Sequence, residues 1–572
     1  MALLSAGAAI LTAATSWCAS LTLEVSHTMN GEPLILDSLR YKNAAGETFS
    51  VTRLSYLLSG VALQQENGAW MELPNAVAWL DAGKRRTLVE LPGITPGKYR
   101  AIKFHIGPDV AANAADPATF SPDHPLNANL NGLHWSWQGG YIFMAMEGLY
   151  RAGASDLEGY AYHIARNPNR VAINLTAALD LSHNSRAVLG FDPGTLFNAP
   201  RPVSFQKDGA STHSREGDPI AAALAANLPG AFRVIQIISD APAFKTPARP
   251  APPLYLPEKF TPYSFTMSRS FPIPDLPRDN PLIEERIALG KTLFNDPALS
   301  VDGSISCASC HQSNTAFTDA RKFSPGVRGQ HGTRNSMPLI NLAWKTSFFW
   351  DGRASTLRAQ ALMPIQDHTE MDQSLGSLTK KLAAQPAYAK LFTAAFSPAE
   401  ITPEKIGLAL EQFLLTLTSF NSRFDQALRG QATLTELEKR GFELFMTEYE
   451  PRTGQKGADC FHCHGGPLFS DHQFHNNGLE PNGDDQGRSK ITGQASDQSK
   501  FATPTLRNIA RTAPYMHDGR FATLEAAIQH YSQGIHRSPT LDPNLAKHPQ
   551  GGLLLSDEDQ RALVVFLKSL SD

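Results

Sequence analysis

Two cysteine motifs offer the most specific chemistry in the chain, because each combines two thiols with an imidazole at a fixed spacing. They are Cys307-Ala308-Ser309-Cys310-His311 and Cys460-Phe461-His462-Cys463-His464. Cysteines spaced in this way attach a c-type haem through two thioethers, and the adjoining histidine ligates the iron. A zinc site or a redox dithiol is the alternative, but no further cysteine pair completes a tetrahedral zinc site. Since the motifs use four of the five cysteines, we expect two covalently bound haem c groups.

The bulk composition limits the remaining classes of function. A chain of 572 residues with a net charge of −3 suits several globular domains and gives no electrostatic basis for binding nucleic acid. Residues 1–20 hold an apolar run that ends in small residues, which resembles a secretory signal; a buried N-terminal helix is the alternative. We expect a periplasmic protein without a membrane span in its mature chain, because haem c is attached outside the cytoplasm.

Residues 20–243 show the alternation of a β-rich domain. Apolar and polar residues alternate with period two over 21–26, 102–106 and 170–175, and glycine–proline pairs separate such runs. The pattern predicts an antiparallel β-sandwich or barrel-like domain. A proline-rich linker follows over 244–281, where the chain should be extended and semi-rigid and should run over the surface.

After the linker the apolar period becomes helical. Residues 563–570 carry leucine and phenylalanine at i, i+3, i+4 and i+7, and Thr435 with Glu438 forms a candidate capping box. The sequence therefore predicts a multidomain protein, in which the β domain precedes two all-α cytochrome c lobes. The lobes are expected over 282–430 and 431–572, with one haem motif in each.

Several residues of the β domain are candidates for chemistry as well as for packing. His27 continues the apolar series of its strand, so it should face the core, where an imidazole needs a partner or a metal ion. His134 and His163 have the same two interpretations. Three tryptophans are either core aromatics or redox-active groups, namely Trp79, Trp135 and Trp137.

Five further segments of the helical half are distinctive. They are 289–296, 332–336, 349–354, 370–371 and 514–525. Together with the two haem motifs, they resemble the bacterial di-haem cytochrome c peroxidase family, which includes MauG and MbnH. The resemblance runs through essentially all of 282–572, and its motifs are highly specific.

The resemblance implies roles for individual residues. The first haem, ligated by His311, would react with peroxide, and Glu370 would be its distal acid–base group. Gln360 would lie near Glu370, and Trp350 would relay electrons or holes between the haems. Three positions match the family's calcium site between the haems, where oxygen atoms hold the ion: Asn335, Thr512 and Pro514.

One position departs from the ordinary peroxidases. Where those enzymes place a methionine ligand to the second haem, this chain has Tyr531, as MauG and its nearest relatives do. A phenolate oxygen would stabilise oxidised iron and lower the reduction potential. Met516 is the alternative ligand. His331, in a glycine-flanked loop, is a candidate to block the first haem, and the sequence leaves this open.

The β domain resembles the MbnP family of periplasmic copper proteins over 21–36, 51–59 and 134–148. In that family a tryptophan is oxidised to kynurenine, which holds copper(I) together with two histidines. The resemblance gives His27 and His163 as copper candidates, with His134 third. Among the tryptophans we favour Trp79, because Trp135 and Trp137 lie in what looks like a framework motif.

The joint occurrence of these parts suggests a self-contained modification system. Hydrogen peroxide, or oxygen plus electrons, would oxidise the helical half to a high-valent state, and holes would pass to a tryptophan of the chain's own β domain. The resulting kynurenine would complete a copper site. One alternative is a peroxidase that removes hydrogen peroxide with electrons from a cytochrome. Another is a non-enzymatic copper-binding or electron-transfer protein, in which copper binding would not depend on Glu370.

Overall fold

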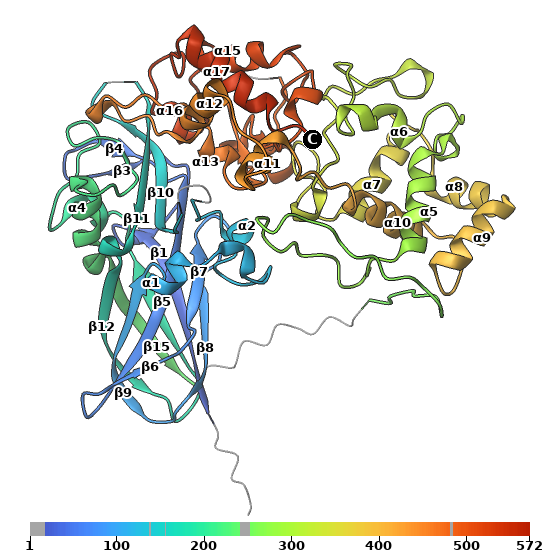
Figure 1. The fold of residues 1–572 in the computed structure, drawn as a ribbon. Helices are drawn as coiled ribbons and strands as arrows, with labels where there is room; N and C mark the ends of the chain where they lie inside the picture. Colours follow the sequence, from blue (N-terminus) through green and yellow to red (C-terminus); the bar gives the residue numbers. More distant parts are fainter. Residues whose placement is uncertain (1–17, 136–138, 155, 241–251, 481–483) are drawn as a thin grey trace, which may run out of the picture.

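A computed structural model describes residues 18–135, 139–154, 156–240, 252–480 and 484–572 (Figure 1). Most of the signal-like segment and the candidate Trp137 lie outside the described residues. Within the described ranges, no helix has the length and apolar character needed to cross a membrane.

Two sheets form the N-terminal half, which confirms the predicted β-rich domain. The smaller has the order β15–β13–β1–β2, and β8 also pairs with β1. Its strands are β1 (Ala19–Met29), β2 (Glu32–Pro33), β8 (Leu88–Ile94), β13 (Ser185–Phe191) and β15 (Phe232–Ser239). The larger follows the order β12–β9–β5–β10–β11–β14. Its strands are β3 (Tyr41–Lys42), β4 (Thr48–Phe49), β5 (Arg53–Gln65), β6 (Trp70–Glu72), β7 (Val77–Asp81), β9 (Lys98–Ile106), β10 (Ile142–Arg151), β11 (Glu158–Ala165), β12 (Val171–Asp180) and β14 (Ser211–Thr212).

The alternation alone suggested purely antiparallel sheets, but the structure also contains parallel strand pairs. The pairs β1–β13 and β11–β14 are parallel. Their members are far apart in the sequence, and long crossover connections permit parallel pairing where a hairpin cannot. Short helices lie in the connections between strands of this domain: α1 (Val110–Ala114), α2 (Ala128–Asn131), α3 (Thr195–Asn198) and α4 (Pro219–Asn227).

The helical half contains both predicted haem motifs, each on a short helix. The first lobe holds α5 (Glu284–Asn295), α6 (Cys307–Cys310), α7 (Leu357–Gln366), α8 (Leu375–Ala383), α9 (Pro386–Ala395) and α10 (Pro403–Leu415). The second holds α11 (Arg423–Leu428), α12 (Glu436–Met446), α13 (Phe461–His464), α14 (Ser489–Thr492), α15 (Leu524–Gln533), α16 (Pro543–Ala546) and α17 (Asp557–Lys568), with the strand pair β16 (Phe474–His475) and β17 (Phe501–Ala502). The predicted capping box of Thr435 and Glu438 begins α12.

The boundary between the lobes differs from the sequence prediction. Helix α11 lies within 282–430, but Phe424 packs on Phe442 and Phe566, with ring centroids 5.1 and 5.4 Å apart. Asp425 is paired with Arg507 at 2.7 Å. These contacts place α11 in the second lobe, which therefore begins before residue 431.

The last part of the proline-rich segment is built into the first lobe. Phe271 is fully buried in the core of that lobe. The Trp344 indole donates a hydrogen bond to the Pro272 carbonyl at 2.7 Å. From Phe271 onward the segment therefore packs against the first lobe, whereas residues 252–270 are mostly exposed and run over the surface, as the composition predicts.

The second lobe is docked on the β domain. Figure 1 shows it lying on one end of the β domain and alongside the first lobe. One apolar core runs without a break from the β strands into the second lobe. Helix α16 lies so close to β11 that a Cβ atom on Gly159 would be 1.9 Å from the Pro543 carbonyl oxygen. Glycine is therefore required at this contact.

Candidate functional site

Each haem motif presents its thiols and its histidine to a largely apolar cavity. In the first lobe, Cys307, Cys310 and His311 line one cavity, and the His311 Nδ1–H donates to the Phe317 carbonyl at 2.8 Å. In the second lobe, the His464 Nδ1–H donates to the Phe469 carbonyl at 3.1 Å. A backbone acceptor on Nδ1 fixes the tautomer whose Nε2 can ligate a metal. The residues present therefore fit two haem c groups.

The predicted acid–base residues lie in the first cavity. Glu370 and Gln360 both line it together with the haem motif. Burial and, to a smaller extent, the nearby Asp367 carboxylate raise the pKa of Glu370 to about 7, and Arg353 opposes this shift. A carboxyl group that titrates near neutrality is suited to proton transfer at working pH.

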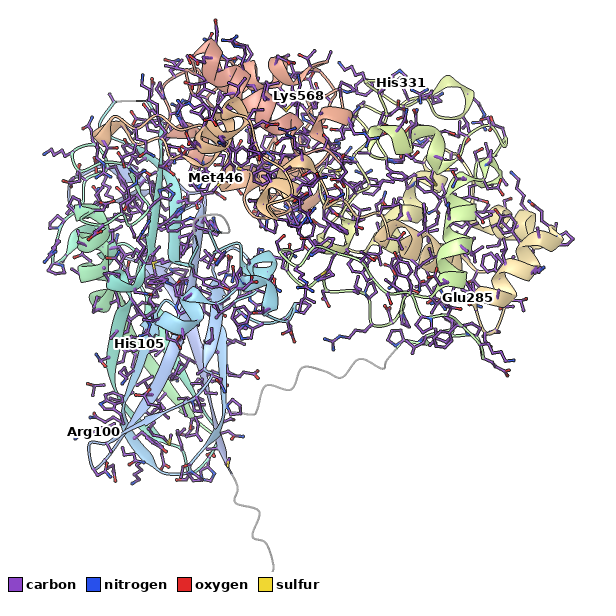
Figure 2. The ribbon with its side chains drawn as sticks, in the orientation of Figure 1. Arg100, His105, Glu285, His331, Met446 and Lys568 are labelled. Atoms are coloured by element: carbon purple, nitrogen blue, oxygen red, sulfur yellow. The ribbon has the colours of Figure 1, made fainter. Side chains whose placement is uncertain are left out.

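His331 does not line this cavity. Its side chain is exposed and its ring stacks on Phe323, with centroids 5.8 Å apart. Figure 2 shows it at the outer edge of the first lobe. In this conformation of the protein, His331 does not block the first haem position.

Trp350 links the two cavities, because it lines both of them. Its indole N–H donates to the Asn335 carbonyl at 2.8 Å, which fixes the ring between the lobes. Asn335, Thr512 and Pro514, the calcium candidates, all line the second cavity close to Trp350. The carbonyl of Asn335 is thus already an acceptor for the indole.

Tyr531 reaches the second cavity from α15. Leu524, Ala527 and Ile528 are buried on the same face, at spacings that place Tyr531 in line with them. The Asn477 side-chain amide lies 3.2 Å from the Tyr531 hydroxyl and 3.4 Å from the Met516 sulfur. Burial raises the pKa of Tyr531 to about 12, so a phenolate here needs a cation as its partner. Both predicted alternatives for the ligand therefore border one cavity.

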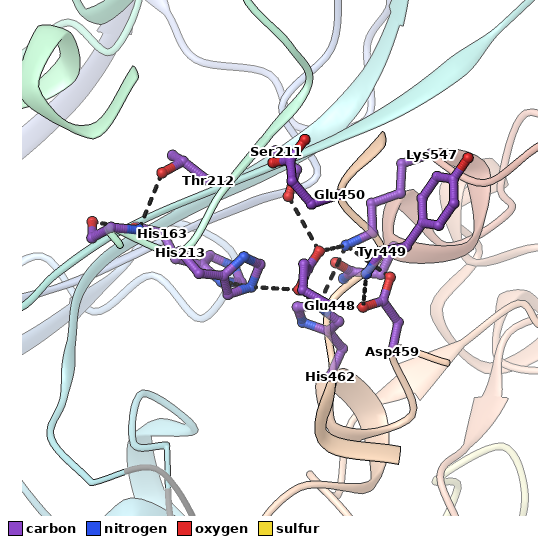
Figure 3. A network of polar contacts seen from close by, with 12 residues as sticks. His163, Ser211, Thr212, His213, Glu448, Tyr449, Glu450, Asp459, His462 and Lys547 are labelled. Atoms are coloured by element: carbon purple, nitrogen blue, oxygen red, sulfur yellow. Dashed lines mark hydrogen bonds and ion pairs between the residues drawn. The ribbon is translucent and has the colours of Figure 1, made fainter. Parts of the chain in front are cut away.

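A cluster of three histidines connects the β domain to the second haem motif (Figure 3). His163 comes from β11, and parallel pairing of β14 with β11 brings His213 beside it. The third is His462, which lies inside the cysteine motif on α13. His163 Nδ1 is 3.0 Å from His213 Nε2. The ring centroid of His462 lies 5.1 Å from that of His213 and 5.6 Å from that of His163.

Glu448 is the hub of polar contacts across this junction. It accepts a hydrogen bond from the Ser211 hydroxyl at 3.2 Å and lies 3.0 Å from His213 Nε2 and 2.9 Å from His462 Nε2. Lys547 contacts Glu448 and also pairs with Asp459 at 3.1 Å. The Lys547 ammonium, with His462, holds the pKa of Glu448 well below its usual range despite burial.

Trp135 lies against this histidine cluster. Its ring centroid is 5.7 Å from that of His213, and its side chain is buried. Trp135, His134, His163 and His462 line one cavity between the β domain and the second lobe. His462 also lines the second haem cavity, so it separates the two spaces.

The other predicted residues of the β domain lie in different surroundings. Trp79 is buried on β7, where its indole N–H donates to the Ser55 hydroxyl at 2.8 Å. Two cations lie over its ring, Lys84 at 5.1 Å and Arg86 at 4.7 Å from the centroid. His27 is half-buried on β1, with Nε2 3.0 Å from the Tyr56 hydroxyl.

Sequence reasoning missed His213 and His462. His462 occupies a variable position of the cysteine motif, and His213 follows a two-residue strand with no clear alternation. The one available signal was that His462 lies inside the second cysteine motif, and no pattern pointed to His213. Their convergence depends on how two distant segments pack.

Comparison with known proteins agrees with this architecture. Residues 284–433 match the family model described as di-haem cytochrome c peroxidase, and residues 19–214 match the MbnP model. The methylamine utilization protein MauG of Methylorubrum extorquens is 39% identical over 298 residues, which cover 51% of this chain and 80% of that protein. The cytochrome c551 peroxidase of Nitrosomonas europaea is 36% identical over 268 residues, which cover 46% and 77%.

A crystal structure of a MauG-like protein associated with microbial copper homeostasis is 34% identical, with a TM-score of 0.48, and covers 54% of this chain and 96% of that one. The family matches and the MauG relatives account for both halves of the sequence. The chain therefore belongs to the di-haem cytochrome c peroxidase family as a MauG-like member, and it carries an MbnP domain ahead of its haem lobes.

Proposed function

We propose that this chain is a di-haem oxidase that uses hydrogen peroxide to convert a tryptophan of its own β domain, Trp135, to kynurenine. The observation that carries the proposal is the position of Trp135. Its ring lies against His213, and His213 and His462 share Glu448 as a partner. The candidate substrate is thus linked by direct contacts to the second haem motif.

Electrostatics favour Trp135 over Trp79, the residue that sequence comparison suggested. Removing an electron from an indole leaves a positive charge on the ring. Lys84 and Arg86 over Trp79 would each raise the cost of that charge by about 1 to 3 kcal/mol. The histidine cluster beside Trp135 instead adjoins two buried carboxylates, Glu147 and Glu448. Each is paired with one cation, Arg53 or Lys547, so these pairs are close to neutral and add no uncompensated positive charge.

The residues of the first lobe would manage the protons of the reaction. Bound haem supplies the oxidising equivalents that peroxide delivers. Glu370 takes a proton from peroxide and returns it to the departing water, with Gln360 beside it in the cavity. Trp350 spans the two cavities as the route between lobes. Tyr531 is the proposed ligand that keeps the second haem oxidised.

The overall conversion balances with peroxide as the oxidant. Tryptophan and two molecules of hydrogen peroxide give N-formylkynurenine and two of water. Hydrolysis then releases formate and leaves kynurenine. The new carbonyl and aniline, together with His163, are the groups proposed to bind copper(I), a metal that accepts imidazole in sites of low coordination number. His134 borders the same cavity, whereas His27 is engaged with Tyr56. We also propose that the chain is exported to the periplasm.

Peptide mass spectrometry of the haem-loaded full chain tests the proposal. After peroxide, the peptide that holds Trp135 should lose one carbon and gain one oxygen. A Glu370→Gln chain should leave that peptide unmodified. A Trp79→Phe chain is the matched control and should still be modified at Trp135. Modification confined to Trp79, or no modified tryptophan after peroxide, would refute the assignment.

A second function is favoured by one observation. Met516 borders the second cavity and shares Asn477 with Tyr531, so a methionine-ligated haem is sterically available. With that ligand the chain would remove hydrogen peroxide with electrons from a cytochrome. Rapid peroxide turnover with reduced cytochrome c, and a sulfur ligand in the spectrum of the second haem, would support this function.

A further inference from the structure

We infer that His163 and His213 of the β domain and His462 of the second haem lobe form one copper site that closes across the domain junction. The site needs no kynurenine, because its three donors are unmodified imidazoles. It rests on the proposed function only for the choice of copper as the metal. It differs from the copper sets that the sequence suggested, which drew every ligand from the β domain. It is a site of the unmodified chain and an alternative to the kynurenine site, because the one free lone pair of His163, on Nδ1, can serve only one copper ion.

The geometry is close to that of a three-nitrogen site. One ring nitrogen from each histidine lies within 4.8 Å of the others. A metal about 2.0 to 2.1 Å from each nitrogen requires nitrogen separations of roughly 3.5 Å. His163 Nδ1 and His213 Nε2 already lie 3.0 Å apart. Small rotations of the rings would therefore complete the site.

The surroundings prepare the nitrogens to donate. His163 Nε2 donates to Glu147 at 2.9 Å, which leaves the Nδ1 lone pair facing His213. This carboxylate–histidine pair is the arrangement that orients and strengthens metal-binding imidazoles. His213 Nε2 lies 3.0 Å from the lone pair-bearing Nδ1 of His163 and 3.0 Å from a Glu448 oxygen. A proton on His213 Nε2 can therefore be shared by two acceptors at once. A cation at this point satisfies all of them.

A neighbouring cluster is a weaker metal candidate. Glu448, Asp459 and His462 also converge, but the Lys547 ammonium lies between the two carboxylates. That positive charge already compensates the two carboxylates. It also lies 3.4 Å from His462 Nε2, so it disfavours a second cation on that side of the His462 ring. The metal is therefore assigned to the imidazole side, where nitrogen donors suit copper. The cavity lined by His163, His462 and Trp135 provides an entry path.

The position of His462 gives the site a link to the second haem. It stands between Phe461 and Cys463 in the motif, two residues before the ligand His464. Its side chain is 5% exposed, compared with 1% for His163 and 11% for His213. A metal on His462 should shift the position of α13 and so perturb the absorption of the second haem.

The test uses the haem-loaded full chain as a Glu370→Gln variant, checked by mass spectrometry to have an unmodified Trp135. Copper(I) is titrated against a chromophoric chelator, and X-ray absorption counts the nitrogen ligands. We expect one tightly bound copper with three nitrogens and a shift in the Soret band of the second haem. The variants His462→Gln and His213→Gln should each weaken binding at least tenfold and lower the nitrogen count.

His472→Gln is the matched control, because His472 lines the same cavity without belonging to the cluster. It should leave copper affinity unchanged. Pyridine haemochrome spectra should show two haems in every variant, so that loss of haem is recognised. Unchanged affinity and ligand count in His462→Gln and His213→Gln would overturn the proposal. Because the titration uses unmodified chain, a failure of tryptophan oxidation would not affect its outcome.

Discussion

Glu370 should set the pH dependence of the reaction with peroxide. Its surroundings raise its pKa from 4.5 to about 7, which corresponds to about 3 kcal/mol against the carboxylate form. The carboxylate is the form that accepts a proton from hydrogen peroxide. The rate constant should therefore rise roughly tenfold per pH unit below neutrality and level off above it.

Stopped-flow measurement of the haem absorption after mixing with peroxide, from acid to alkaline pH, checks this expectation. Glu370→Gln should lower the plateau rate by about 10²- to 10⁴-fold and abolish the acid limb. Asp367→Asn removes a negative neighbour and should move the limb to lower pH, whereas Arg353→Gln should move it to higher pH. A flat profile in the parent chain, or an intact limb in Glu370→Gln, would refute the reasoning.

The raised pKa of Glu370 also predicts how the stability of the folded protein changes with pH. Since the folded-state pKa is raised, the contribution of Glu370 to stability is complete below pH 4.5 and is lost as the pH rises through about 7. Glu370→Gln should remove this loss. Comparison of unfolding free energies at the two ends of that range measures it, and an identical pH dependence in both chains would contradict the sign.

Three other changes have expected outcomes. Gly159→Ala places a Cβ 1.9 Å from a carbonyl of α16, so hydrogen exchange should increase in β11 and α16, whereas Gly376→Ala, which meets open space, should change nothing there. Equal exchange in both would contradict the tight contact. Lys547→Met removes the ammonium partner of two buried carboxylates and should lower the unfolding free energy by about 3 to 5 kcal/mol in denaturant melts. The exposed Lys568→Met should cost less than about 1 kcal/mol, and similar losses would show that burial is irrelevant. Tyr531→Met should raise the reduction potential of the second haem in a redox titration and abolish tryptophan oxidation; an unchanged potential would remove Tyr531 as the ligand.

The local signals in the sequence were sufficient for much of the fold. Alternation predicted the β-rich half, and helical periodicity with the capping box at Thr435 predicted α12 and α17. The cysteine motifs, Glu370 and Trp350 line two cavities, and the roles that the family resemblance gives these residues stay predictions. These features depend on short-range spacing or on specific motifs, which a single sequence retains.

What the sequence did not reveal depends on contacts between distant segments. His213 reaches His163 only through a parallel strand pair, and His462 reaches both through docking of the second lobe. Helix α11 was assigned to the wrong lobe because its own pattern does not show that Phe424 packs on α17. We favoured Trp79 over Trp135 because Trp135 lies in what looks like a framework motif. The cations over Trp79, on which the proposal for Trp135 depends, are visible only in the folded chain.

The continuous apolar core between the β strands and the second lobe has a consequence for turnover. An oxidase that shares a hydrophobic core with its target domain cannot release that domain and bind an unmodified one. Under the proposed function each polypeptide performs the indole conversion once, as a self-limiting reagent rather than a recycling catalyst. Oxidant supplied beyond that stoichiometry must then find another electron source or damage the chain itself.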